Sequence, residues 1–284
     1  MPASTPPPTV RRRRLGTELR RLRERTDLSA TEAAALFGAT QSRISNIEAG
    51  RYGVSADRVR ALARTYDCSD QALIDALASM TGERKRGWWE EYREALPVGL
   101  TDLAELEHHA TALRVAQVIN IPGLLQTVDY ARAIFREAVP PLLPHDIEFR
   151  VSHRIKRQAI LYRDAPPPYT AVIHEAALRM QFGGRSVAKS QLDHIITMSE
   201  RDNVTIAVIP FDGTAFPSAG HGIDYFHGPV RQLDTALIDT ADNGSLIDAA
   251  AQLDRCRLVL DRMEHVALKP TPSRDLIHNI SKAL

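Results

Sequence analysis

Residues 15–51 read LGTELRRLRERTDLSATEAAALFGATQSRISNIEAGR, and this stretch carries the clearest structural signals in the first third of the chain. Its apolar residues first recur every three or four positions, which is the spacing of one face of an α-helix. The pattern predicts a helix over about 13–26 that buries Leu15, Leu19 and Leu22.

The same stretch contains the signals that start and stop two further helices. Ser29 and Glu32 have capping-box spacing, so a second helix is expected to run through Leu36. Gly38 breaks that helix, and Thr40 can cap a third helix that ends near Gly50. Two short helices joined by a glycine-containing turn are typical of a helix-turn-helix.

The third helix has two chemically different faces. At 100° per residue, Ile44 and Ile47 point to one side. The opposite face carries short uncharged donors and acceptors, with an arginine at its edge: Gln41, Ser42, Arg43, Ser45 and Asn46. Such groups read base edges in the major groove of DNA, although a merely solvated polar face has the same composition. Its place after the turn favours base reading.

Two more helices complete the predicted domain over 13–81. Residues 55–66 and 69–80 have helical spacing, with core candidates Val59, Leu62, Leu73 and Leu77. An all-α five-helix N-terminal domain is therefore expected.

Positive charge is concentrated at the start of the chain. The whole sequence has a net charge of +1, but residues 1–80 carry thirteen arginines against nine acidic residues, which is +4. Residues 1–12 contain four prolines and predict a disordered arm. We expect phosphate contacts from the arm, the helix-three cap and the residue after helix three: Arg11, Arg12, Arg13, Arg14, Thr40 and Arg51. The alternative is a solvated basic tail.

With its LRRLRE first helix and TQSRISNIEAGR run, the stretch resembles the Xre/Cro family of phage-repressor-like regulators. The resemblance implies binding to double-stranded DNA, with helix three in the major groove. It also aligns Arg23 and Glu48 with an ion pair between helix one and the end of helix three. At Ala30 the family usually has Gln, which puts fine details of docking in doubt.

A second, larger domain is expected over 88–284, after a charged linker at 82–87 (GERKRG). Short runs rich in Val, Ile and Tyr predict strands near 115–119, 169–174, 204–209, 222–227 and 236–239. Helical patterns near 129–137, 145–162, 187–201, 245–263 and 273–283 separate most of them. The pattern predicts an α+β domain.

This second domain resembles the one that follows the helix-turn-helix in actinobacterial antitoxin-like transcriptional regulators. The matching pieces include GWWEEYREALP, INIPGLLQTVDYARAIF, QLDHIITMSERDNVTIAVIPF and SRDLIHNIS. The resemblance implies a small acidic protein partner encoded nearby, and it supplies no catalytic residues.

The sequence lacks the spacings of catalytic and metal motifs. His108 and His109 are adjacent on an expected helix, about 100° apart, so they form a poor metal pair. Only two cysteines occur, which suits the reducing cytoplasm, and no apolar run approaches membrane-spanning length. We expect no enzyme activity, cofactor or metal, and a cytoplasmic protein that joins the nucleoid when bound to DNA. The Pro-Gly-Leu-Leu run at 122–125 is a structural turn, or the border of a groove for peptide or ligand.

Three functions are compatible with these patterns. The first is a transcriptional regulator controlled by a small protein partner through residues 88–284. The second senses a small molecule in an apolar pocket of that domain. The third is an enzyme with a DNA-binding appendage, which no motif supports. A homodimer is expected because one helix-turn-helix covers few base pairs, with Trp88 and Trp89 as candidates for a subunit or interdomain interface, or for burial in their own domain.

Overall fold

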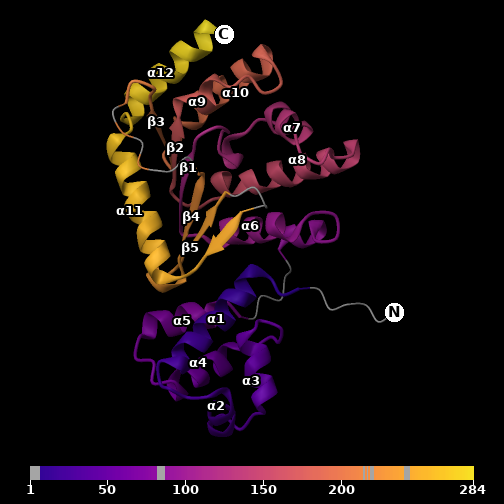
Figure 1. Cartoon of the computed structure of the whole chain (residues 1–284), viewed down its shortest axis with the longest axis vertical. Coiled ribbons are helices and arrows are strands. Elements are labelled where there is room, and N and C mark those ends of the chain that lie inside the picture. The colour runs from indigo at the N-terminus through magenta and orange to yellow at the C-terminus, as the bar shows by residue number, and fades with distance from the viewer. Residues whose placement is uncertain (1–6, 82–86, 214, 216, 218–220, 240–243) are drawn as a thin grey trace. The chain divides into compact units, whose positions relative to one another are not determined.

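The computed structural model describes residues 7–81, 87–213, 215, 217, 221–239 and 244–284. The chain forms two compact units. One comprises residues up to Glu90 together with Pro229–Leu233; the other comprises Glu91–Gly228 and Asp234–Leu284. A helical N-terminal unit and an α+β C-terminal unit confirm the expected fold class (Figure 1). The expected linker at 82–87 lies, except for Gly87, outside the described residues.

The N-terminal unit contains five α-helices, as expected. They are α1 (Val10–Glu24), α2 (Ala30–Leu36), α3 (Gln41–Glu48), α4 (Ala56–Thr65) and α5 (Gln71–Ser79). The capping box is present: the Glu32 amide donates to Ser29 Oγ at 3.2 Å, and the Ser29 amide donates to Glu32 Oε2 at 2.8 Å. Thr40 caps α3 by accepting from the Arg43 amide at 3.3 Å.

The first helix starts earlier than its apolar spacing predicts. It begins at Val10, capped by Thr9, whose side chain accepts from the Arg12 amide at 3.3 Å. The expected disordered arm is therefore wrong for residues 10–12, because a cap and a buried valine extend the helix backward. Residues 1–6 of that arm lie outside the described residues.

All the predicted apolar positions of the five helices lie in one core. It contains Leu15, Leu19, Leu22, Ile44, Ile47, Val59, Leu62, Leu73 and Leu77. Leu233, from the short segment Pro229–Leu233, also belongs to this core. No local pattern could have predicted that residue, because more than 150 positions separate it from α5.

Two glycines allow α1 to approach the end of α3 closely. A Cβ atom at Gly16 would overlap the carbonyl oxygen of Glu48. Gly50 has φ +70°, and a Cβ there would lie 2.9 Å from the carbonyl oxygen of Arg12. The first half of α1 therefore packs closely against the end of α3 and the turn that follows it.

The C-terminal unit is built on a six-stranded mixed sheet of order β3-β2-β1-β4-β5-β6. The strands are β1 (Ala112–Gln117), β2 (Tyr169–His174), β3 (Val204–Ile209), β4 (Ile223–His227), β5 (Thr235–Ile238) and β6 (Ser245–Ile247). The first three strands are parallel, and the last three continue the sheet in antiparallel pairs.

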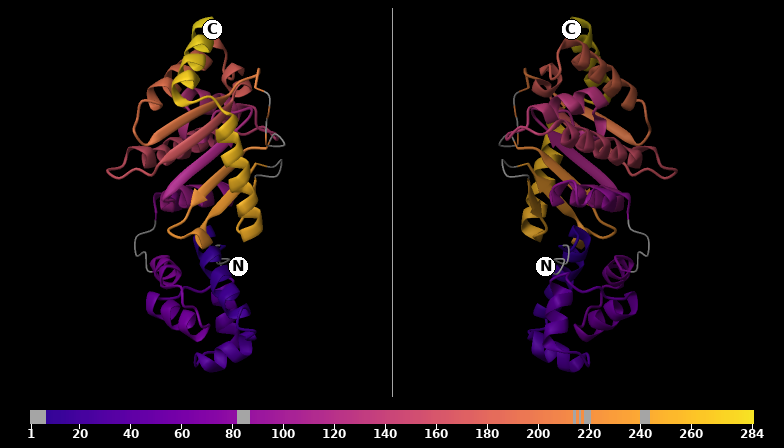
Figure 2. Two further views of the ribbon diagram at one scale, coloured as in Figure 1. Left: turned by 90° about the vertical axis from the view of Figure 1, so that its left-hand side faces the viewer. Right: turned by 90° about the vertical axis from the view of Figure 1, so that its right-hand side faces the viewer.

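Helices cover both faces of this sheet (Figure 2). They are α6 (Val98–His109), α7 (Val128–Arg136), α8 (Pro144–Gln158), α9 (Glu175–Arg179), α10 (Arg185–Met198), α11 (Ala250–Val266) and α12 (Pro270–Ala283). Leu113 and Val115 of β1 pack into the larger apolar cluster with residues of α6, α9, α10 and α12, while α11 packs on the opposite face. Short 3-10 helices lie at Trp88–Tyr92, Gly123–Leu125, Ala159–Tyr162 and Arg231–Leu233.

The expected strands at 169–174, 204–209, 222–227 and 236–239 match β2 to β5 within one residue at each end, and four of the five expected helices match α7, α8, α10 and α12 within a few residues. The helix expected from Ser245 starts at Ala250, because Ser245–Ile247 forms β6 by pairing with β5. The first strand begins three residues before its expected start. The short helix α9 was not predicted. Trp89, a candidate for a subunit interface, is buried, so its ring is not available for contact with a second subunit. Trp88 is partly buried.

Candidate nucleic-acid interface

The third helix separates a buried face from a polar face, as its sequence predicts. Ile44 and Ile47 are buried, and both belong to the core of the N-terminal unit. Gln41, Ser42 and Arg43 are exposed, while Ser45 and Asn46 are partly exposed. The five candidate base readers therefore project from one accessible side of α3.

The two amide side chains of this face are already held in place. Gln41 Nε2 donates to Ser45 Oγ at 2.9 Å, and Asn46 Nδ2 donates to the carbonyl oxygen of Ser42 at 2.9 Å. Among the described residues, neither amide oxygen has a partner, and each amide nitrogen keeps a second N–H. That oxygen and N–H pair is what a bidentate contact with adenine requires.

The groups expected to bind phosphate differ in whether their side chains already form hydrogen bonds within the protein. Arg51 is exposed just after α3 and makes no side-chain bond to any described residue, and the same holds for Arg43 at the edge of the reading face. The Thr40 hydroxyl already caps α3 and lies 3.1 Å from Ser42 Oγ. It could contact a phosphate only while sharing those bonds.

The four arginines at the start of α1 have different surroundings. Arg11 Nη2 donates to the Ser79 carbonyl at 3.1 Å, and Arg13 Nη1 donates to the Pro8 carbonyl at 2.6 Å. Arg14 is buried, where it donates to the Gln232 carbonyl and lies 3.2 Å from a carboxylate oxygen of Glu18. Arg12 alone of the four is exposed without a partner among the described residues. A single flexible arm is therefore the wrong description, because a helix fixes each arginine in a different direction.

The ion pair implied for α1 and α3 is present. Arg23 Nε lies 2.7 Å from Glu48 Oε1, and Arg23 Nη2 lies 2.8 Å from Glu48 Oε2. Arg23 Nη1 also donates to the Leu28 carbonyl at 2.6 Å. Both side chains are nearly buried, and the hydrogen bond to Glu48 raises the pKa of the Arg23 guanidinium. This bidentate pair fixes the end of α3 against α1.

Tyr52 is a candidate that the sequence patterns missed. It follows Arg51 directly, its side chain is 55% exposed, and its amide donates to the Asn46 carbonyl at 3.2 Å. An aromatic hydroxyl beside the end of a recognition helix can donate to a phosphate. Its position between Gly50 and Gly53 was the available signal.

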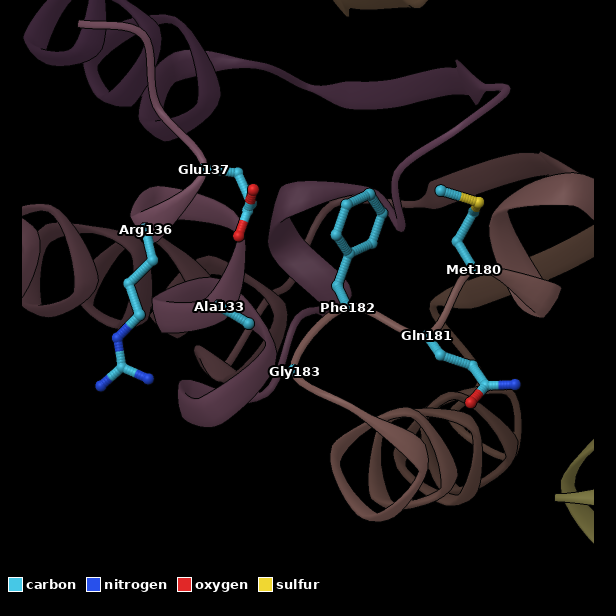
Figure 3. Close-up of a pocket in the computed structure, with 7 residues that line it drawn as sticks. All are labelled: Ala133, Arg136, Glu137, Met180, Gln181, Phe182 and Gly183. Atoms are coloured by element: carbon cyan, nitrogen blue, oxygen red, sulfur yellow. The ribbon is translucent and has the colours of Figure 1, made fainter. Parts of the chain in front are cut away.

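The C-terminal unit has a surface pocket of about 470 Å³ between α7 and the connection from α9 to α10 (Figure 3). It is lined by Ala133, Arg136, Glu137, Met180, Gln181, Phe182 and Gly183. Phe182 projects into its centre, whereas the Arg136 guanidinium points away from that ring. Its polar groups do not converge, so this pocket lacks the arrangement expected of a small-molecule site.

The histidines show no metal-binding arrangement. His108 and His109 stack edge to face with ring centroids 4.9 Å apart. Within the described ranges, no group of three or more His, Cys, Asp and Glu side chains could hold a metal ion. No helix in the part of the chain that the structure describes is long and apolar enough to cross a membrane.

Comparison with known proteins gives two family matches. The profile of a helix-turn-helix domain matches residues 14–77. The profile of a domain of unknown function, DUF5753, matches residues 100–279. Neither a search of curated proteins nor a search of solved structures found a match. The helix-turn-helix domain supports a DNA-binding regulator, and because the second match covers more than half of the chain, the protein belongs to the DUF5753 family.

Proposed function

We propose that this protein is a transcriptional regulator that binds double-stranded DNA sequence-specifically, with α3 in the major groove. The observation that carries the proposal is the polar face of α3, which lies opposite the buried Ile44 and Ile47. Gln41 and Asn46 each retain the amide groups that recognise adenine, and Arg43 is free to reach guanine or a phosphate.

Phosphate contacts would position this helix. The α3 N-terminus is capped by a neutral threonine, so its positive end can face an anion. Arg51 and Tyr52 follow the other end of α3, and the contact at Gly50 brings Arg12 close to them. Groups at both ends of the reading helix could therefore contact the DNA backbone.

Membership of the Xre/Cro group is part of the proposal. The capping box of α2, the turn glycine Gly38 at φ +62° and the Arg23–Glu48 pair support it. In that group a two-fold dimer reads two half-sites, so we also propose a homodimer.

Control through the C-terminal unit has two candidate forms. The resemblance to antitoxin-like regulators supports a small acidic protein partner, which stays a prediction. Sensing of a small molecule is favoured by one observation: a cluster of incompletely paired charges, Arg154, Asp224 and Asp239, lies against the sheet of that unit. Either effector would act by preferring one arrangement of the two DNA-reading heads.

Selection of bound sequences from random DNA by the full chain tests the DNA-binding proposal. We expect one enriched motif. Gln41→Ala or Asn46→Ala should then weaken motif binding by about 1–3 kcal/mol and leave binding to random DNA nearly unchanged. Gln71→Ala is a matched control, because Gln71 forms the same kind of bond to the side chain four residues ahead, on α5. Equal losses on motif and random DNA would show that α3 does not read bases.

A further inference from the structure

A group of polar residues gathers at one edge of the C-terminal sheet. Gln117 ends β1, Asp224 lies near the start of the antiparallel β4, and Asp239 directly follows β5. Gln117 Nε2 donates to Asp239 Oδ2 at 3.2 Å, and the Asp239 amide donates to the Gly222 carbonyl at 3.0 Å. By strand alternation, Gln117 and Asp224 share the face of Leu113 and Val115, which packs into the larger apolar cluster.

Two helices bring charged side chains toward the same region. Arg157 of α8 forms a buried bidentate pair with Glu107 of α6, with Nε–Oε2 and Nη2–Oε1 distances of 2.7 and 2.5 Å. Its neighbour Arg154 has no carboxylate partner among the described residues: its Nη1 donates to the neutral Gln126 Oε1 at 2.5 Å. Both charges of the Arg157–Glu107 pair are therefore matched, whereas the charge of Arg154 has no ion-pair partner among the described residues.

The carboxylates are also incompletely matched. Neither Asp224 nor Asp239 forms an ion pair with any residue that the structure describes. Burial, followed by the charges of Asp239 and Glu107, raises the pKa of Asp224 to about 7. Burial and the charge of Arg157 lower the pKa of Arg154 to about 9. Arg157 and a hydrogen bond from Gln117 favour the charged form of Asp224, and Glu107, Asp224 and Asp239 favour that of Arg154, but burial and like charges outweigh them.

Tyr169 supplies an independent observation. Its side chain is 1% exposed, and its hydroxyl has no hydrogen-bond partner among the described residues. The hydroxyl interacts electrostatically with Asp224, Glu107 and Arg157, so it faces this cluster. An unpaired buried hydroxyl is destabilising, and a hydrogen bond to a ligand's polar atom would offset that cost.

The residues of the cluster differ in exposure, and two glycines lie next to its charged groups. Asp239 is exposed, Gln117, Asp224 and Arg154 are partly buried, and Tyr169 is enclosed, so exposure falls from the surface inward. A Cβ at Gly222 would overlap Asp239 Oδ2. A Cβ at Gly123 would lie 3.3 Å from Arg154 Nη1 and 3.4 Å from Arg157 Nη2. Any side chain at these two positions would crowd the charged groups.

We propose that Asp224, Asp239, Arg154 and Tyr169 bind a small zwitterion that carries an ammonium and a carboxylate group, as a free amino acid does. The ammonium group would lie between Asp224 and Asp239, and the carboxylate would accept from Arg154. Setting aside the closed Glu107–Arg157 pair, the site has two negative charges and one positive charge, which favours an amino acid with a second, cationic group. This assignment deepens the sensing form of the proposed function and rests on it for any effect on DNA.

Titration calorimetry with the full chain, without DNA, tests binding directly. The probes are the twenty common L-amino acids, putrescine as a diamine without a carboxylate, and succinate as a diacid without an ammonium group. We expect saturable binding of at least one amino acid, strongest among the basic ones, and weaker or no binding of putrescine and succinate. No saturable heat from any amino acid, or putrescine binding in preference to all of them, would overturn the assignment.

Two variants locate the site. Asp224→Asn and Arg154→Gln should each weaken binding of the amino acid at least tenfold, while circular dichroism stays unchanged. Asp202→Asn is the matched control, because Asp202 is an exposed carboxylate of the same unit that forms no ion pair with a described residue. Unchanged affinity in both site variants would overturn the proposal.

A separate assay keeps this proposal apart from the DNA-binding proposal. The affinity of the full chain for its selected motif is measured with and without the amino acid. Amino-acid binding that depends on Asp224, in a chain that selects no motif, would contradict the regulator and leave the site intact. Motif binding without amino-acid binding would contradict the site alone.

Discussion

The two units treat buried charge differently. In the N-terminal unit, Arg23 and Glu48 meet in a bidentate pair, and a third nitrogen of Arg23 is bound by the Leu28 carbonyl. In the C-terminal unit, the equally complete Arg157–Glu107 pair lies beside Arg154 and Asp224, which have no opposite charge in contact among the described residues.

The difference indicates where each unit interacts with other molecules. In the helix-turn-helix, the buried Arg23–Glu48 pair is complete, and the uncharged amides of Gln41 and Asn46 lie on the accessible face of α3, where the proposed DNA partner would contact them. In the sheet unit, the partly buried Asp224 and Arg154 lack an ion pair among the described residues, and we propose a small molecule as their partner. A fully paired charge is structural, whereas an unpaired buried one needs another explanation.

The largest loss of stability is expected when the buried Arg157–Glu107 pair of the C-terminal unit is broken. Arg157→Met should destabilise this unit by about 3–5 kcal/mol, because Glu107 would stay buried without its partner. Urea unfolding of the full chain, followed by circular dichroism, measures the change. The double variant Glu107→Gln with Arg157→Met should recover much of the loss. A single variant as stable as the wild type would contradict the closed-pair description.

Breaking the corresponding pair of the N-terminal unit should have a smaller effect. Arg23→Ala should cost up to about 3 kcal/mol, since it leaves Glu48 nearly buried and unpaired. Arg20→Ala removes only an exposed pair with Glu24, worth about 0–1 kcal/mol, and Arg21→Ala removes a partly exposed one with Glu18. Thermal unfolding of the three variants compares them. Equal shifts in all three would show that Arg23 has no special role.

Removing the charge of Asp224, which has no ion-pair partner among the described residues, should raise the stability of the protein rather than lower it. The pKa of Asp224 is raised to about 7, so its contribution to stability is present below about pH 4 and lost as the pH rises through 7. Asp224→Asn should therefore stabilise the protein at pH 8 by about 1–3 kcal/mol and at pH 5 by much less. The charged groups that face Asp224 are Asp239, Glu107, Arg157 and Arg154. Urea unfolding at the two pH values measures this, and an equal gain at both would be inconsistent with a strained charge.

The smallest effect concerns the exposed end of α1. Arg12→Gln should reduce the slope of log K for DNA against log salt by about 0.9, the value for one phosphate contact. Arg262→Gln, which removes an exposed arginine from α11, should leave the slope unchanged. Equal slopes for both variants and the wild type would show that Arg12 does not reach DNA.

Much of α3 could be predicted because its signals are local. The Ser29–Glu32 capping box, the Thr40 cap and the spacing of Ile44 and Ile47 each depend on residues within one or two turns. The backward extension to Val10 was missed, because prolines just before it favoured an arm over a helix.

Features that depend on long-range pairing could not be predicted. Ser245–Ile247 forms a strand because β5 offers it an edge, although helical spacing follows directly. In the sequence, Asp224 resembles any polar strand residue. Its charged neighbours Glu107 and Arg157 come from α6 and α8, which pack against the sheet only in the folded protein. The polar cluster combines residues from distant parts of the chain, so no single motif reveals it.

The hydrogen bonds within the polar face of α3 affect how DNA specificity could change. Gln41 is held by Ser45, and Asn46 by the carbonyl of Ser42. A substitution at Ser45 would release the amide of Gln41 as well as remove its own hydroxyl. The energetic effects of two such changes should therefore not add, since residues in one hydrogen-bond network are coupled. On the proposed base-reading role of α3, we therefore expect a change of operator preference to depend on combinations of substitutions at these positions.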